Sequence, residues 1–352
     1  MCGPQACERE VTMTASTDFT DLTSPFRGEL LAHCYRMLGS VDEAEDLVQE
    51  TYLRAWRSFG GFEGRSSVRT WLYRIATNAC LTALERRGRR PMPSGLAGPA
   101  ANPDIALAPA PEVPWLQPVP DALLAGAGED PASAVAARAG IRLALVAAQQ
   151  YLPARQRAML ILRDVLGWPA AEVAGLLGTT TTAVNSGLRR ARAQLARALP
   201  AEEDTAEPND PGQRAALDRF AAAFENADAE ALAELLRKDA VLEMPPLPGW
   251  FAGRDAIRAF FAAQVLTEPG MFRLVPTAAN GQPAFAAYQR DAGGTYRAHA
   301  VLVLALSPAG IARVDIFLEP GLFGRFGLPE AATGERVSPR PGPITSTSFP
   351  RT

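Results

Sequence analysis

The chain has 352 residues, enough for two or three domains that each bury a core, and its net charge at pH 7 is only −3. The four cysteines form no Cys-x-x-Cys pair and the chain has two histidines, so we expect neither a metal site nor a disulfide framework. The N-terminus lacks an apolar run of signal-peptide length, and no stretch of the chain approaches the length of a membrane span. These features predict a cytoplasmic protein without membrane contact or cofactor.

Two basic segments are hidden by the small net charge. Residues 63–90 and 151–200 each contain seven arginines against two acidic residues. Two basic segments in an acidic chain indicate two separate contacts with a polyanion, although solvated arginine-rich helices would give the same pattern.

Composition and periodicity divide the chain into seven segments. Their expected character is, in order, a disordered N-terminus (1–20), a helical block (21–91), an Ala/Pro-rich linker (92–130), a second helical block (131–200), an acidic linker (201–212), a domain of helices followed by strands (213–330) and a disordered tail (331–352). In the third domain "TYRAHAVLVLAL" and "GIARVDIFL", joined by "SPAG", predict a β-hairpin.

The first helical block contains two informative helices. "VDEAEDLVQETYLRAWRSF" predicts an amphipathic helix whose acidic residues lie away from its apolar stripe. "SVRTWLYRIATNACLTALERRGRR" predicts a helix with a buried stripe and a second, polar and aromatic stripe made of Ser67, Trp71, Arg74, Asn78 and Thr82. Arginine, an aromatic ring and an amide on one face suit single-stranded DNA, because they supply phosphate neutralisation, stacking and a reader for an extruded base.

The second block contains the pattern of a helix-turn-helix. In "PAAEVAGLLGTTTTAVNSGLRRARAQL", Ala174 is small enough for a close helix crossing, Gly178 suits the turn, and Val184 and Leu188 face inward. Polar residues that can reach base edges and phosphates in a major groove lie on the outer face, namely Thr181, Thr182, Asn185, Ser186, Arg189 and Arg190. A helical hairpin of unrelated purpose is the alternative.

Both blocks resemble regions 2 and 4 of bacterial sigma-70 family RNA polymerase sigma factors of the extracytoplasmic-function (ECF) type, over roughly residues 21–200. The resemblance implies that Asp46, Leu47, Gln49 and Glu50 bind the β′ coiled coil of core polymerase, which would also be bound through its β flap. It implies −35 recognition by the outer face of the helix-turn-helix, and −10 recognition and melting by Arg65, Trp71, Arg74, Asn78, Arg86 and Arg87. Trp71 is equally consistent with a role in the core.

Residues 213–330 resemble the SnoaL-like, nuclear-transport-factor-like fold, an α+β cone with an apolar interior. ECF factors fused to such a domain carry a Trp-Leu-x-Pro motif in the linker, represented here by Trp115, Leu116 and Pro118, followed by Asp121. We expect residues 114–121 to dock against the C-terminal domain, which would regulate the factor in cis, because a stiff Trp-Leu anchor loses little entropy on docking. The alternative is that Trp115 packs on region 2 or region 4.

The predicted architecture is therefore multidomain, with two all-α sigma domains and one α+β cone, and the predicted partners are core RNA polymerase and promoter DNA. The competing hypotheses are a cyclase or isomerase fused to a DNA-binding module, and a plain helix-turn-helix repressor. In the enzyme hypothesis His299 and Asp315 would form a general acid–base pair. A ligand pocket in the cone would be lined by Trp250, Phe285, Tyr288, His299 and Asp315, together with Met244 and Phe251.

Overall fold

The computed structural model describes residues 19–64, 66–103, 108–124, 140–198 and 211–332. The chain forms two compact units, each described by itself below. Unit 1 comprises residues 1–91 and 113–202, and unit 2 comprises residues 92–112 and 203–352.

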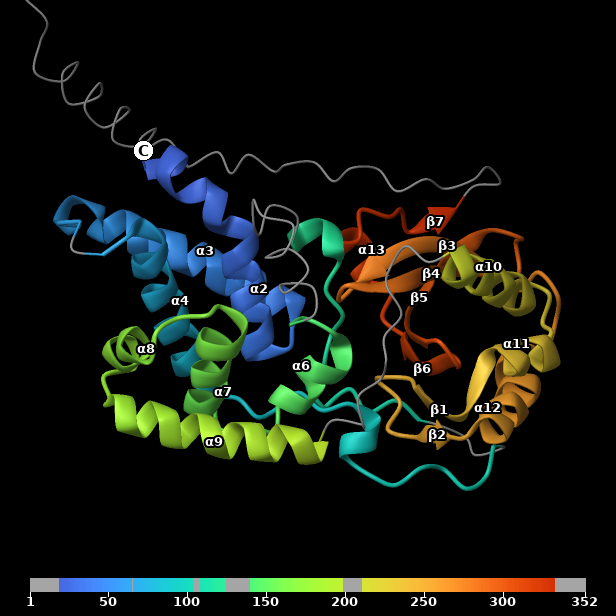
Figure 1. Cartoon of the computed structure of the whole chain (residues 1–352). Helices are drawn as coiled ribbons and strands as arrows, with labels where there is room; N and C mark the ends of the chain where they lie inside the picture. Colours follow the sequence, from blue (N-terminus) through green and yellow to red (C-terminus); the bar gives the residue numbers. More distant parts are fainter. Residues whose placement is uncertain (1–18, 65, 104–107, 125–139, 199–210, 333–352) are drawn as a thin grey trace, which may run out of the picture. The chain divides into compact units, whose positions relative to one another are not determined.

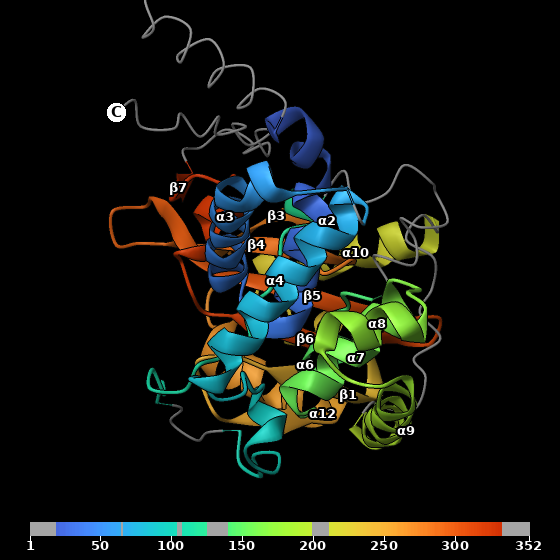
Figure 2. The same ribbon diagram turned by 90° about the vertical axis from the view of Figure 1, so that its left-hand side faces the viewer.

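Block 1 of unit 1 is a group of three helices, α2 (Arg27–Leu38), α3 (Val41–Ser58) and α4 (Val68–Glu85), which pack on one another (Figure 1, Figure 2). The 3₁₀ turns η1 (Ser24–Phe26) and η2 (Phe59–Gly61) flank α2 and α3. Gly39 ends α2 with a φ of +70°, which glycine adopts without strain, and the Ser40 hydroxyl caps α3 by accepting the Glu43 N–H. The chain therefore reverses between α2 and α3 within two residues.

Block 2 of unit 1 contains α6 (Leu143–Gln149), α7 (Ala154–Leu160) with a π-helical extension η5 (Ile161–Val165), α8 (Ala170–Leu177) and α9 (Thr181–Ala198). Gly178, with a φ of +60°, ends α8, and the Thr180 hydroxyl accepts the Ala183 N–H to cap α9. Val184, Leu188 and Ala191 are buried on the inner face of α9. The predicted helix-turn-helix is confirmed by this geometry.

Unit 2 is an α+β domain. The turn η3 (Pro93–Gly95) is followed by α10 (Pro211–Glu225), α11 (Ala229–Leu235), β1 (Leu236–Glu243), β2 (Trp250–Ala252), α12 (Arg254–Phe260) with a π-helical extension η6 (Phe261–Val265), β3 (Phe272–Ala279), β4 (Gln282–Arg290), β5 (Tyr296–Ser307), β6 (Gly310–Phe317), α13 (Leu322–Arg325) and β7 (Ala331–Ala332). The strand order is β2-β1-β6-β5-β4-β3, and β7 pairs with β5. All described pairs are antiparallel except β1 with β6. The predicted β5–β6 hairpin and the predicted fold class are confirmed.

The core of unit 2 lies between one face of this sheet and helices α10, α11 and α12, which Figure 1 shows grouped beside it. Aromatic rings dominate the core: Phe220 stacks on Phe285 at 5.9 Å, and Phe251 stacks on Phe260 at 4.5 Å. Phe285, predicted as a pocket residue, is therefore a core residue of the domain.

Several predicted segment boundaries need correction. Phe19 is buried against Trp56 and Phe59, so this residue of the segment 1–20 belongs to the folded block 1. Ala331 and Ala332 form β7, since their backbone pairs with β5. Within the described residues, no helix is long and apolar enough to cross a membrane.

The described parts of the segment 92–130 are not a solvated linker. Residues 92–112 belong to unit 2, where the Ser94 N–H donates to the buried Glu243 carboxylate at 2.6 Å and Trp250 Nε1 donates to the Ala97 carbonyl at 2.8 Å. Residues 113–124 belong to unit 1 and end in the turn η4 (Asp121–Leu124). The linker is thus divided between two folded units.

Candidate nucleic-acid interface

An acidic face of α3 is presented outward from block 1. The residues that face the interior are Val41, Ala44, Val48, Thr51 and Ala55, all buried. Asp46 and Gln49 are exposed, Leu47 is half-buried, and Glu50 accepts a hydrogen bond from Arg54 at 2.7 Å. Leu53, 43% exposed, continues this face. From the sequence, it was assigned neither to the apolar stripe nor to the polymerase-binding residues. The face can bind a partner that offers cations around an apolar centre.

The exposed stripe of α4 is polar and basic. Arg74, Asn78, Thr82, Arg86 and Arg87 are exposed, whereas Leu72, Ala76 and Cys80 are buried on the opposite side. Arg87 makes an ion pair with Glu43 of α3, and Arg74 donates to the Gly175 carbonyl of α8 at 3.3 Å. Arg65 lies outside the described residues. The stripe brings cations and an amide together as single-stranded nucleic acid requires.

Trp71 occupies the end of this stripe in a half-buried aromatic cluster. Its ring lies 4.8 Å from the Phe62 ring, at an interplanar angle of 34°, and 6.5 Å from the Phe59 ring. Because the indole is half-buried, it stabilises the turn before α4 and still offers part of its surface to a base. The two roles considered from the sequence are therefore compatible in one side chain.

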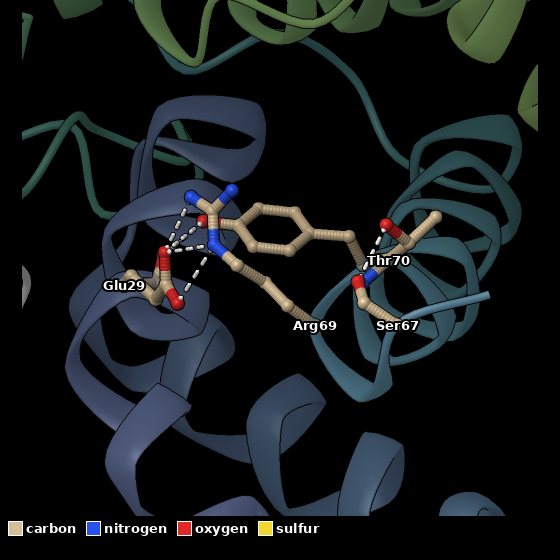
Figure 3. A network of polar contacts seen from close by, with 5 residues as sticks. Glu29, Ser67, Arg69 and Thr70 are labelled. Carbon is tan, nitrogen blue, oxygen red and sulfur yellow. Dashed lines mark hydrogen bonds and ion pairs between the residues drawn. The ribbon is translucent and has the colours of Figure 1, made fainter. Parts of the chain in front are cut away.

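A polar network that the sequence analysis missed holds α4 on α2 (Figure 3). Arg69 clamps the Glu29 carboxylate with Nε at 2.9 Å from Oε2 and Nη2 at 2.7 Å from the same oxygen, and the Tyr73 hydroxyl donates to it at 3.1 Å. At the start of α4 the Ser67 hydroxyl accepts the Thr70 N–H at 3.1 Å (Figure 3). Tyr73 is fully buried, and burial raises the pKa of its hydroxyl.

The network continues into the interior at His33. Its Nε2 lies 2.9 Å from the Thr77 hydroxyl, and its ring makes an edge contact with Tyr73 at 5.1 Å. Burial, and second the charge of Arg36, lowers the pKa of His33 to about 3, so the imidazole is neutral at physiological pH. From the sequence, the polar residues of α4 were expected to face solvent. Tyr73 and Thr77 are polar but buried, and the helical periodicity gave no indication of this.

The outer face of α9 carries the predicted DNA-reading residues. Thr181, Thr182, Asn185, Arg189 and Arg190 are exposed and Ser186 is half-buried. On the inner face, a Cβ added at Gly187 would lie 2.5 Å from the Met159 sulfur, so glycine lets α9 approach α7 closely. The structure thus brings two hydroxyls, an amide and two guanidinium groups onto one exposed surface of a helix-turn-helix.

The arginines of α7 and η5 do more than keep the block in solution. Arg157 is buried and donates to the Met37 carbonyl of α2, to the Gln150 carbonyl at 2.9 Å and to Gln150 Oε1 at 2.8 Å. Arg155 donates to the Leu177 carbonyl and Arg163 to the Trp168 carbonyl. Arg157 therefore joins block 2 to block 1 through a desolvated cation, whose burial lowers its pKa to about 10.

Two further contacts within unit 1 join the blocks. The Trp168 ring makes an edge contact with Tyr73 of α4 at 5.4 Å, and the guanidinium of Arg89 lies 4.8 Å from the centre of the Tyr151 ring. Together with the bond from Arg74 to Gly175, these contacts place α8 beside the exposed polar stripe of α4. In this arrangement part of the stripe is engaged by block 2.

Residues 113–124, here called the strap, are bound along block 1. The Leu116 N–H donates to the Pro91 carbonyl and the Gln117 N–H to the Gly39 carbonyl, at 3.2 and 3.0 Å. The Gln117 side chain accepts from Ser40 at 2.6 Å and donates to Asp42 at 3.1 Å, while the Trp115 carbonyl accepts from Arg90 at 2.9 Å. Pro118 is buried and Asp121 half-buried. These hydrogen bonds join the strap to block 1, as the alternative expected, while docking on the C-terminal domain stays a prediction.

Leu116 is fully buried, and its Cδ1 would lie 2.7 Å from a Cβ added at Gly39. Gly39 therefore serves two requirements, a positive φ at the end of α2 and a space for the strap leucine. The sequence signalled the anchor itself, whereas nothing in it specified the surface to which the anchor binds.

The predicted pocket residues of unit 2 separate in the structure. A cavity of about 290 Å³ is lined by His299 and Met244, but its lining does not include Trp250, Phe251, Phe285, Tyr288 or Asp315. Tyr288 points its hydroxyl to the Pro329 carbonyl at 3.0 Å. Asp315 lies beside Arg313. The residues on either side of it in β6, Val314 and Ile316, belong to the core, so Asp315 points to the face of the sheet away from the core. His299 and Asp315 are thus on opposite sides of the sheet, which does not support an acid–base pair.

Comparison with known proteins identifies three modules. Residues 22–90 match the Sigma-70 region 2 model, 142–195 the Sigma-70 region 4 model and 217–314 the SnoaL-like domain model. The ECF RNA polymerase sigma factor SigG of Mycobacterium tuberculosis is 50% identical over 316 residues, which are 89% of this chain and 85% of the relative. The ECF RNA polymerase sigma factor SigW of Bacillus subtilis is 39% identical over 69 residues, 20% of this chain and 37% of the relative. The crystal structure of the M. tuberculosis ECF sigma factor SigJ has the same fold, with a TM-score of 0.55 at 22% identity, over 90% of this chain and 99% of that chain.

Proposed function

The chain belongs to the extracytoplasmic-function (ECF) RNA polymerase sigma factors, and from this premise we propose which of its surfaces bind core polymerase and promoter DNA, and how these surfaces become available. Block 1 is region 2 and block 2 is region 4 of the family. The chain directs transcription initiation together with RNA polymerase, and we assign this work to the cytoplasm.

The acidic face of α3 is the proposed binding surface for the β′ coiled coil of core polymerase. Asp46, Gln49 and Glu50 lie on this face within the two helical turns that precede the exposed Leu53, and Leu47 is half-buried. Acidic side chains next to an exposed apolar residue suit a protein–protein interface with a basic partner surface. Asp46→Lys is expected to weaken binding to core polymerase at least tenfold, while Glu234→Lys, an exposed acid on α11, leaves binding unchanged in the same pull-down titration.

The exposed stripe of α4 is the proposed −10 surface. Arg74 and Arg86 would neutralise phosphates, the free surface of Trp71 would stack, and Asn78 would read an extruded base. Asn78→Ala is expected to lower open-complex formation and to relax selectivity at one base of the −10 element. Arg86→Ala, by contrast, is expected to weaken all −10 sequences equally and to reduce the salt dependence of binding. Equal effects of the two variants on matched and mismatched promoters would contradict this division of roles.

The outer face of α9 is the proposed −35 surface. The residues that would contact base edges and phosphates are Thr181, Thr182, Asn185, Ser186, Arg189 and Arg190. Arg190→Ala is expected to weaken −35 binding about tenfold, as lost bidentate or phosphate contacts do. Arg219→Ala, an exposed arginine on α10, is the matched control for loss of one positive charge.

Region 4 would have to leave region 2 before both promoter elements can be bound. The −10 and −35 elements lie about 25 base pairs apart, which is about 85 Å along DNA at about 3.4 Å per pair. In unit 1, however, Arg157, Trp168 and Arg74 hold the two regions in direct contact. We therefore assign the described arrangement of unit 1 to a resting state, which opens when the factor binds polymerase and promoter.

The SnoaL-like domain would regulate this opening in cis through the linker, and we assign it no catalytic role. One part of the linker is folded into unit 2 by Glu243 and Trp250, and the next part is the strap on region 2. Run-off transcription with core polymerase tests the proposal. Trp115→Ala, which loosens the strap, is expected to raise transcript yield at limiting polymerase, whereas Pro114→Ala, at an exposed neighbouring position, is not. Equal yields from the wild type and Trp115→Ala would refute a strap-controlled resting state.

A further inference from the structure

The SnoaL-like domain contains a cavity of about 290 Å³, close to the lower end of the about 300–1,000 Å³ of small-molecule sites. Its walls are mostly apolar. The aromatic and sulfur-containing residues among them are Phe224, Phe260, Phe272, Met244 and Met271. Rings and thioethers adapt to flat apolar molecules, and methionine is a common lining of sites that accept varied ligands.

A β-bulge turns His299 into this cavity. In the pairing of β4 with β5, Ala287 is opposite Ala300 and Tyr288 is opposite Ala298, so His299 is the extra residue. Along a regular strand, alternate residues face one side, and Ala300 and Leu302 already line the cavity. The bulge lets the consecutive residues His299 and Ala300 share that side, as bulges do where a side chain is re-aimed beside a functional site.

The His299 ring is available to a ligand. It contacts the Phe272 ring at 5.5 Å, and no hydrogen bond from another described residue to its imidazole is found. Burial lowers the pKa of His299, so the ring is neutral at pH 7 and has one donor and one acceptor nitrogen. A half-buried imidazole in an apolar cavity, with no hydrogen-bond partner among the described residues, favours a ligand that supplies one hydrogen bond.

A second local irregularity shapes the wall opposite the sheet. After α12 the helix widens into the π-helical turn η6, and two of its residues, Gln264 and Val265, line the cavity. Such turns occur often at functional sites because they redirect side chains without ending the helix. Gln264 is exposed and Gln289 half-buried, so the amides lie toward solvent while the interior is apolar.

The charge of the lining defines the ligand class. None of the described lining residues is a carboxylate, a lysine or an arginine. A charged group buried there would lose its hydration without gaining a counter-ion, which costs several kcal/mol. We propose that the cavity of the SnoaL-like domain binds a small, neutral, largely apolar molecule through one hydrogen bond to His299. This proposal is independent of the promoter and polymerase interfaces assigned above.

Two dyes with the same arylamine skeleton test the charge requirement on the full chain. N-phenyl-1-naphthylamine is neutral, carries one N–H, and becomes fluorescent in an apolar site, whereas 8-anilino-1-naphthalenesulfonate adds an anionic group. The neutral dye is expected to bind with a stoichiometry of one and to bind at least tenfold more tightly than the sulfonate. Equal affinities, or binding at several equivalent sites, would overturn the proposal.

Three variants locate the binding. Ala287→Ile fills the cavity and is expected to weaken binding of the neutral dye at least tenfold, and His299→Leu keeps the apolar lining and is expected to weaken it about fivefold. Ala278→Ile, an exposed position on β3 outside the lining, is the matched control and should bind like the wild type. Unchanged binding in Ala287→Ile would place the dye elsewhere and refute the site.

A measurement on the wild type keeps the test valid if Ala287→Ile fails to fold. With ¹³C-labelled methionine methyl groups, the neutral dye is expected to shift the signals of Met244 and Met271 by ring currents and to leave those of Met37 and Met159 in place. Shifts confined to Met37 and Met159, or no shift at saturating dye, would exclude the cavity as the binding site.

Discussion

The buried imidazole of His33 gives unit 1 a pH-dependent stability that can be calculated. Burial lowers its pKa from 6.5 to about 3 in the folded chain, while the unfolded chain keeps the ordinary value. The unfolded state therefore binds the proton more tightly than the folded state. As the pH falls below 6.5, protonation of His33 in the unfolded chain lowers the free energy of unfolding. Between pH 7 and pH 5 this difference lowers the free energy of unfolding by about 2 kcal/mol. His33→Gln, which does not titrate, is expected to remove that part of the pH dependence.

Urea unfolding of the wild type and His33→Gln at pH 7 and pH 5 measures this difference. His299→Gln is the comparison variant. Because the pKa of His299 is also lowered but His299 lies in unit 2, this variant shows how much of the pH dependence of stability comes from unit 2. The chain has two histidines, so imidazole NMR signals can be assigned with these two variants, and the His33 signal is expected not to titrate between pH 8 and pH 5. A midpoint for His33 near 6.5, or a stability difference between wild type and His33→Gln that is the same at both pH values, would refute the reasoning.

Three further variants test other contacts of unit 1. Glu29→Ala leaves the Arg69 and Tyr73 donors without their acceptor and is expected to lower the free energy of unfolding by about 2–3 kcal/mol, whereas Glu50→Ala, which breaks an exposed ion pair, costs less than about 1 kcal/mol in the same urea titration. Leu116→Ala removes a fully buried side chain from the strap and is expected to speed hydrogen exchange of the Gln117 amide at least tenfold; unchanged exchange would show that the strap does not depend on this anchor.

Much of the helical part of the fold could be predicted because its signals are local. The apolar stripe of α3, the glycine after α8 and the apolar spacing of α9 act over a few residues, and each element lies where these signals placed it. The exposed residues of the α4 stripe and of the outer face of α9 followed from the same periodicity. A residue that faces solvent on a helix needs no knowledge of the rest of the chain.

The contacts that join distant elements could not be predicted in this way. Arg157 belongs to a helix rich in arginine, and its sequence neighbours give no sign that it is the one buried against the Met37 carbonyl. Tyr73 and His33 are buried because their polar atoms meet Glu29 and Thr77, partners that are about forty residues away in sequence. Phe285 and Tyr288 are three residues apart in β4, so they point to opposite faces of the sheet and could not both line one pocket; which face carries the core was known only from the fold.

The segment 92–124 bears on how the C-terminal domain could regulate the sigma regions, because its two parts belong to different units. A solvated linker that docks a tryptophan on the C-terminal domain would make the strap and that domain a single body. Instead, the bonds of Ser94, Ala97 and Ala100 tie the first part to unit 2, and those of Leu116 and Gln117 tie the second part to region 2. The linker is therefore a covalent path from the SnoaL-like domain to the strap on region 2. Under the proposed regulation in cis, loosening of the strap, and not a change in unit 2 alone, is therefore expected to release region 4.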